Sequence, residues 1–110
     1  MKVLATVAAA ALSLFALVPA SQAASYNCSG GALNYSERTI CDNPQLSRLD
    51  SSMSATYFRI LRPLRGAVRS DFQKEQVNWL DTRNFCGASV ACLADEYGAH
   101  IADLRSFYAP

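Results

Sequence analysis

Four cysteines constrain the fold of this chain more than any other feature of its sequence. They stand at positions 28, 41, 86 and 92 of 110 residues. An even number of cysteines in a small exported protein is most often a disulfide framework, because a short chain buries too little apolar surface for high stability. Four cysteines allow three pairings, and composition alone does not choose among them.

The N-terminal segment has the pattern of a secretory signal peptide. Lys2 supplies a positive charge, residues 3–18 form an apolar run, and Ser21-Gln22-Ala23 is a small-x-small cleavage site. The apolar run ends at Pro19 and is shorter than the roughly 20 residues that span a bilayer. We therefore expect cleavage between Ala23 and Ala24. The mature protein would be periplasmic or secreted, with no stable membrane anchor.

The charge of the mature chain is balanced. The sequence has ten Lys and Arg residues against nine Asp and Glu, and Lys2 leaves with the signal peptide. A near-neutral chain gives no indication of a nucleic-acid partner or of an anionic membrane surface.

Apolar residues repeat every three or four positions through most of residues 24–110, which predicts helices. No segment shows the strict alternation of a strand. The expected fold is all-α, a single domain over residues 24–110 with three main helices and a short N-terminal helix in an antiparallel bundle. The main helices are expected at about Pro44–Arg62, at about Asp71–Phe85 and from a cap at Ser89 to about Phe107.

Local motifs suggest where these helices begin and end. Asn34 and Ser36 are alternative caps for the short helix, and Asn34 with Glu37 resembles a capping box. Pro44 after an Asp-Asn pair suits the first turn of the next helix. The run Ser70-Asp71-Phe72-Gln73 also resembles a capping box and predicts a helix start there. Gly87 is suited to a left-handed helix end.

The segment FCGASVAC, residues 85–92, has two cysteines with five residues between them. A zinc site usually uses closely spaced Cys or His pairs, but twelve residues lie between Cys28 and Cys41. A redox motif would be Cys-x-x-Cys at a helix start. The spacing fits best a structural disulfide that joins the end of one helix to the start of the next. We favour the local pairs Cys28–Cys41 and Cys86–Cys92, and a crossed pairing at the shared end of the bundle is the alternative.

One face of the second main helix, expected at about Asp71–Phe85, is unusually polar. Gln76, Trp79 and Arg83 share this face, and a buried arginine requires a partner. The partner would be Asp50 on the preceding helix, or one carboxylate of Asp95-Glu96 on the last. Two interpretations follow: a polar network that fixes helix register, or a recognition surface with Trp and Arg as anchors.

The sequence indicates no catalytic centre. His100 is the only histidine, and Glu96 and Asp103 lie within helical reach of it. No serine stands in a nucleophile-elbow motif, and neighbouring carboxylates on a helix do not face each other. We interpret His100 as a structural or surface residue, and we expect no enzymatic activity, no metal and no cofactor.

An ordered set of residues resembles the lysozyme-inhibitor LprI-like domain family over about residues 26–105. Its four cysteines stand in the same order as those of the family. The other residues that carry the resemblance are Glu37-Arg38, Ile40, Pro44, Leu46, Leu49-Asp50, Met53, Tyr57, Gln76, Trp79-Leu80, Arg83, Leu93, Tyr97, Ile101 and Leu104.

The resemblance implies a small, helical, exported bacterial domain that is held by disulfides. The family takes its name from a mycobacterial lipoprotein that inhibits lysozyme, whereas this chain lacks a lipid-attachment cysteine. The expected function is therefore stoichiometric inhibition of a lysozyme or another cell-wall hydrolase by a free exported protein. The alternative is a cell-envelope interaction module that binds a protein partner without inhibiting it.

Overall fold

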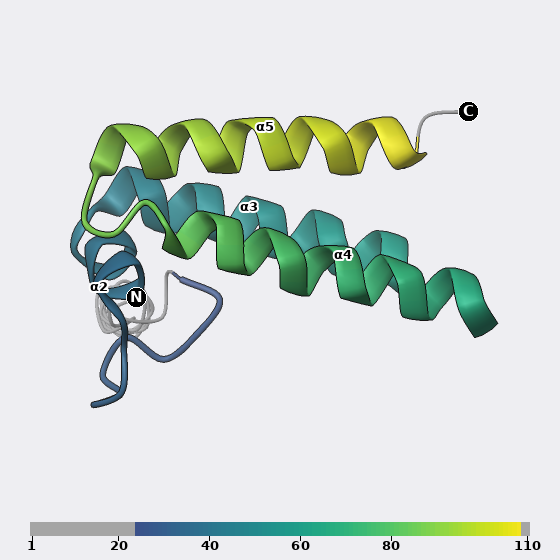
Figure 1. Cartoon of the computed structure of the whole chain (residues 1–110), viewed down its shortest axis with the longest axis horizontal. Coiled ribbons are helices and arrows are strands. Elements are labelled where there is room, and N and C mark those ends of the chain that lie inside the picture. The colour runs from purple at the N-terminus through teal and green to yellow at the C-terminus, as the bar shows by residue number, and fades with distance from the viewer. Residues whose placement is uncertain (1–23, 109–110) are drawn as a thin grey trace, which may run out of the picture.

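The computed structural model describes residues 24–108, and helices are the only regular secondary structure in that range. A short helix precedes three long ones that run up, down and up beside one another (Figure 1). The expected fold class is confirmed. The helices are α2 (Tyr35–Asp42), α3 (Pro44–Leu61), α4 (Gly66–Asn84) and α5 (Val90–Tyr108).

The capping motifs at the first two helices form as predicted. The Asn34 side chain accepts a hydrogen bond from the backbone N–H of Glu37 (2.8 Å), and the Glu37 carboxylate accepts one from the Asn34 N–H (2.9 Å). Asn43 then accepts a bond from the N–H of Leu46 (3.0 Å), with Pro44 in the first turn of α3. These bonds satisfy N–H groups that a helix leaves without partners, so the sequence sets both helix starts locally.

The core lies mainly between α3 and α5, the helices in most extensive contact. The predicted apolar stripe of each helix faces the other, because residues three and four apart share one side of a helix. The short helix α2 closes one end of the core with Ile40. The buried apolar residues are Ala24, Ile40, Leu46, Met53, Tyr57, Ile60, Leu61, Phe72, Leu93, Tyr97, Ile101 and Leu104.

The predicted start of the second main helix at Asp71 is wrong. Helix α4 begins at Gly66, and the Ser70 motif lies inside it. After α3 ends, Gly66 adopts a left-handed backbone (φ 62°), which redirects the chain within a few residues. Arg69 of α4 donates to the carbonyl of Leu61 (2.8 Å) and so caps the end of α3. This tertiary contact holds the first turn of α4 without a side-chain cap.

Helix α4 buries little of its own surface. Only Phe72 and Arg83 among its side chains are buried, and Gln76, Trp79 and Leu80 are half-buried. A helix with so narrow a buried face leaves space along both of its flanks, one toward α3 and one toward α5.

The segment FCGASVAC is a structural staple. Cys86 and Cys92 form a disulfide across the turn between α4 and α5. Gly87 is left-handed (φ 57°), as predicted, and the Ser89 hydroxyl accepts a bond from the N–H of Cys92 (3.2 Å). The hydroxyl of Ser36 donates to the carbonyl of Gly87 (2.8 Å), which ties α2 to this turn.

The second disulfide joins Cys28 to Cys41, so the favoured local pairing is confirmed. It anchors the N-terminal arm, the non-helical residues 24–34, to α2. No cysteine within residues 24–108 is free.

The signal-peptide prediction concerns residues outside the described part, apart from Ala24. Ala24 is buried, and the next residue, Ser25, donates its N–H to a carboxylate oxygen of Asp50 (2.6 Å). In residues 24–108, no helix combines the length and the apolar character needed to cross a membrane.

Candidate functional site

The buried centre of the domain holds a polar network that joins three helices. The Asp50 carboxylate on α3 is fully buried, and the Arg83 guanidinium on α4 is 4% exposed. Their closest atoms, Oδ1 and Nη1, are 3.9 Å apart. Of the three carboxylates considered from the sequence, Asp50 is therefore the partner of Arg83.

The hydroxyl of Tyr97 on α5 bridges Asp50 and Arg83. It donates to Oδ1 of Asp50 (2.7 Å) and accepts from Nη1 of Arg83 (3.3 Å). Burial, and secondly the negative charge of Asp50, raises the pKa of Tyr97, so the hydroxyl stays protonated and remains a donor. The other guanidinium nitrogens donate to the side chain of Asn84 (3.2 and 2.9 Å). Each buried polar group of the network thus has a partner, as burial requires.

A second cluster continues along α4, around the only tryptophan. The Trp79 ring lies parallel to the His100 ring, with centroids 4.0 Å apart and planes 6° apart. The Tyr97 ring meets it edge-on at 5.2 Å. The Arg83 guanidinium carbon lies 6.0 Å from its centroid. Three neighbours therefore fix the orientation of the indole.

Gln76 determines which ring nitrogen of His100 carries the proton. Its side-chain oxygen lies 2.7 Å from Nε2 of His100, and its side-chain nitrogen donates to the sulfur of Met53 (3.2 Å). Because an amide oxygen only accepts, Nε2 carries the proton. Burial lowers the pKa of His100 to about 4, against an opposing effect of the Asp103 charge. The imidazole is therefore neutral at pH 7.

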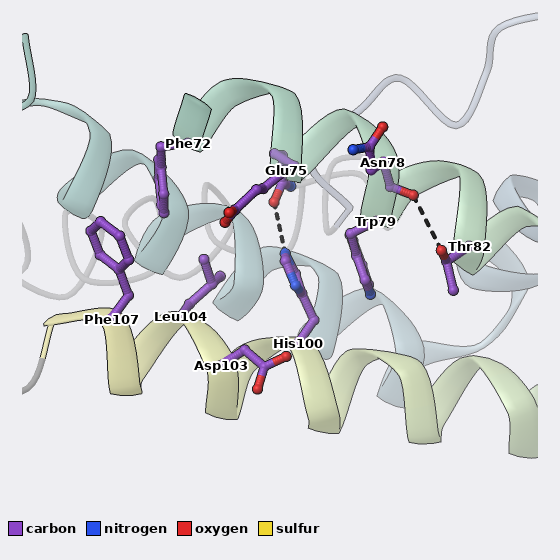
Figure 2. A pocket seen from close by; sticks show the side chains of 10 residues that line it. Phe72, Glu75, Asn78, Trp79, Thr82, His100, Asp103, Leu104 and Phe107 are labelled. Atoms are coloured by element: carbon purple, nitrogen blue, oxygen red, sulfur yellow. Dashed lines mark hydrogen bonds between the residues drawn. The ribbon is translucent and has the colours of Figure 1, made fainter. Parts of the chain in front are cut away.

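A cleft of about 320 Å³ lies between α4 and α5, next to this cluster. Figure 2 shows side chains of the two helices approaching it from opposite walls, with His100 between them. The lining residues are Phe72, Glu75, Gln76, Asn78, Trp79 and Thr82 from α4, and His100, Asp103, Leu104 and Phe107 from α5.

The cleft combines apolar and acidic parts. Phe72 and Phe107 lie at one end with ring centroids 5.0 Å apart, and Phe107 is half exposed. Glu75 and Asp103 are exposed carboxylates on opposite helices. No Lys or Arg side chain is among the lining residues of the described chain. The cleft therefore carries negative charge above an aromatic interior.

The four residues singled out from the sequence divide between the two flanks of α4. Gln76 and Trp79 line the cleft with α5. Asp50 and Arg83 lie on the other side, in a groove of about 470 Å³ toward α3 that Gln76 also reaches. The N-terminal arm reaches this groove, where the Tyr26 hydroxyl donates to the carbonyl of Glu37 (2.8 Å).

Sequence reasoning missed several residues of the α4–α5 cleft. His100, expected to be a structural or surface residue, packs on Trp79 and forms part of the cleft wall, a position that the sequence does not predict. The sequence analysis does not connect Glu75 or Asp103 with Trp79, although helical spacing places Glu75 beside Trp79 and Asp103 beside His100. Glu75 precedes Trp79 by four residues, and Asp103 follows His100 by three, so each pair shares a helix face.

Within residues 24–108, no three His, Cys, Asp or Glu side chains are grouped in a way that could hold a metal ion. Comparisons of the chain with protein-family models, with curated proteins and with solved structures found no match.

Proposed function

We propose that this chain is an exported binding protein that inhibits a lysozyme-type cell-wall hydrolase by stoichiometric binding. The observation that carries the proposal is the α4–α5 cleft, with its aromatic interior and its two exposed carboxylates. The choice of target follows the resemblance to the lysozyme-inhibitor family.

The rigidity of the cleft supports a binding role. The Trp79 ring is held by His100, Tyr97 and Arg83, and the last two belong to the buried network with Asp50. A binding surface whose side chains are already fixed loses little conformational entropy when a partner binds.

The size of the cleft indicates how a partner would bind. A volume of about 320 Å³ lies at the lower end of the range for small-molecule pockets, about 300–1,000 Å³. It suits one or two inserted side chains of a protein, with the exposed surfaces of α4 and α5 providing the rest of the interface. Phe107 at the edge of the cleft would then be covered on binding.

Export is consistent with the cysteines. Structural disulfides form and persist in oxidising compartments, and the chain holds two. We propose the periplasm or the extracellular space as the location, following the signal-peptide pattern.

A bacterial-cell lysis assay tests the proposal. Residues 24–110, which contain every core residue named above, would be titrated against a panel of lysozyme types and cell-wall hydrolases. We expect inhibition that saturates near one-to-one and disappears when the disulfides are reduced. A circular dichroism spectrum would establish that the oxidised protein is helical.

Folded protein that inhibits no enzyme of the panel would contradict the inhibitor proposal. The alternative function, an envelope interaction module, would then be tested by cross-linking in bacterial cells. Under that function, the same cleft would be protected from chemical labelling by an envelope protein.

A further inference from the structure

The charge of the α4–α5 cleft indicates the chemistry of its ligand. Glu75 and Asp103 stand on opposite walls and are both exposed, so they remain accessible to a ligand in the space between the helices. No cationic side chain among the lining residues of the described chain compensates them. An anionic group would be repelled there, whereas a cation would be attracted by both carboxylates.

The rings of His100 and Trp79, which also line the cleft, carry no positive charge that would compete with such a cation. The His100 imidazole is neutral at pH 7, and its Nε2–H is directed to Gln76. Its stacking partner Trp79 carries no charge. An entering cation therefore does not have to displace an internal ion pair.

The apolar interior suits the stem of a long cationic side chain. Lys and Arg bury their methylene groups against apolar surface while the charged group stays near polar atoms. Phe72, Leu104 and Phe107 provide apolar surface at one end of the cleft. Aromatic faces also attract cations directly.

The geometry disfavours a sugar ring stacked on Trp79 as the ligand. A sugar ring usually needs one open aromatic face, but His100 covers one face of Trp79 at 4.0 Å, and the Arg83 guanidinium lies 6.0 Å from the ring centroid. The exposed charges of the cleft, those of Glu75 and Asp103, suit a cationic group instead.

We propose that the α4–α5 cleft binds a lysine or arginine side chain from a basic protein partner, with Glu75 and Asp103 as its charge partners. This inference specifies the binding site of the function proposed above. It rests on that function, because the proposed function makes the partner a protein. The two carboxylates attract the cation, and the apolar residues Phe72, Leu104 and Phe107 line the end of the cleft that takes its methylene stem.

The test uses Nα-acetyl-lysine N-methylamide and its arginine equivalent as probes, and the uncharged norleucine analogue as the control ligand. Binding to the oxidised mature chain would be followed by Trp79 fluorescence and by amide chemical shifts. Trp79 is the only tryptophan, so its emission reports on the cleft wall. We expect saturable binding in the millimolar range for both cations, and at least about tenfold weaker binding for norleucine.

Two double variants separate the cleft from bulk charge. E75Q/D103N removes both cleft carboxylates, and D81N/D95N removes two exposed carboxylates of the same helices that do not line the cleft. Both variants change the net charge equally. We expect the first to weaken probe binding at least about tenfold and the second to leave it unchanged within about twofold.

Equal binding of lysine and norleucine probes, or equal effects of the two double variants, would overturn the inference. The norleucine comparison uses the unmodified chain, so it stands even if a variant fails to fold. Lysozyme inhibition without probe binding would refute this site and leave the proposed function in place. Probe binding without inhibition of any hydrolase would support the site and refute the proposed target.

Discussion

The imidazole of His100 lies flat on the indole of Trp79, with ring centroids 4.0 Å apart. The contact joins α5 to α4 at the wall of the cleft. Because Gln76 also holds Nε2 of the imidazole at 2.7 Å, the ring is fixed by one stacking contact and one hydrogen bond. Burial keeps the imidazole neutral at pH 7, so His100 is a group through which pH acts on the fold.

The first prediction concerns the stability of the protein in mild acid. Burial lowers the pKa of His100 to about 4, below its unfolded value of about 6.5. Between these values the unfolded chain binds more protons than the folded one, so stability is complete above pH 6.5 and falls as pH decreases to 4. The loss from this group is at most about 3 kcal/mol, at about 1.4 kcal/mol per pKa unit.

Urea unfolding from pH 7.5 to 4 measures this loss, and proton NMR of the only histidine gives its pKa directly. The control is H100F, which keeps an aromatic ring on Trp79 and cannot titrate. We expect its stability to change less than that of the parent over the same range. A pKa of 6 or above for His100 in the folded protein would contradict the prediction.

The second prediction concerns the hydroxyl of Tyr97. It bridges Asp50 and Arg83 in the buried network, and its removal leaves both groups with one partner fewer. We expect Y97F to lower the free energy of unfolding by about 1–3 kcal/mol, the usual cost of a buried polar group that loses its partner.

The matched control for this change is Y35F. Tyr35 is 78% exposed, so loss of its hydroxyl should change stability by less than about 0.5 kcal/mol. Chemical denaturation of the two variants gives the comparison. Equal stabilities for Y97F and Y35F would show that the bridge contributes nothing.

Sequence reasoning reached the framework of the fold because the framework depends on local patterns. The Asn34 and Asn43 caps, the apolar stripe of α3 and the Cys86–Cys92 staple each involve residues close together in the chain. The predicted start of α4 at Asp71 is wrong because Arg69 holds the helix start through a contact with Leu61, across the turn from α3. A local capping pattern at Ser70 contains no information on that contact.

The candidate site was only partly predictable for a similar reason. The polar face of Gln76, Trp79 and Arg83 was visible from helical spacing on a single helix. The cleft, however, depends on how far α4 stands from α5, and spacing along one helix does not give that distance. Asp103 therefore enters the site only when the two helices are placed side by side.

The third prediction concerns the disulfides. The Cys28–Cys41 bond closes a loop with a sequence separation of 13, and Cys86–Cys92 one of 6. In the chain-entropy model, each bond stabilises the fold by about 2–3 kcal/mol, and the longer loop contributes slightly more. We expect C28S/C41S and C86S/C92S each to lower the melting temperature, and the first to lower it more.

Melting with and without reductant provides the check for the parent protein. Reduction should lower its melting temperature by more than either double variant does alone, because it opens both loops. Equal melting temperatures with and without reductant would refute the role of the cysteines as staples.

The fourth prediction concerns two glycines with opposite roles. Gly87 has a left-handed backbone in the turn between α4 and α5 (φ 57°), and a Cβ placed there would meet no atom within 4 Å. The cost of G87A is therefore conformational alone, about 1–2 kcal/mol, since L-residues disfavour that backbone. Gly98 is instead an exposed position inside α5, where a Cβ also meets no atom within 4 Å.

At Gly98, alanine should stabilise the protein by about 0.5–1 kcal/mol, because glycine loses more backbone entropy in a helix than alanine does. The two variants add the same methyl group in open space, so the sign of the change separates backbone conformation from packing. Urea unfolding should place G87A below the parent and G98A above it. If both variants shifted stability in the same direction, the left-handed conformation of Gly87 would not be what the turn requires.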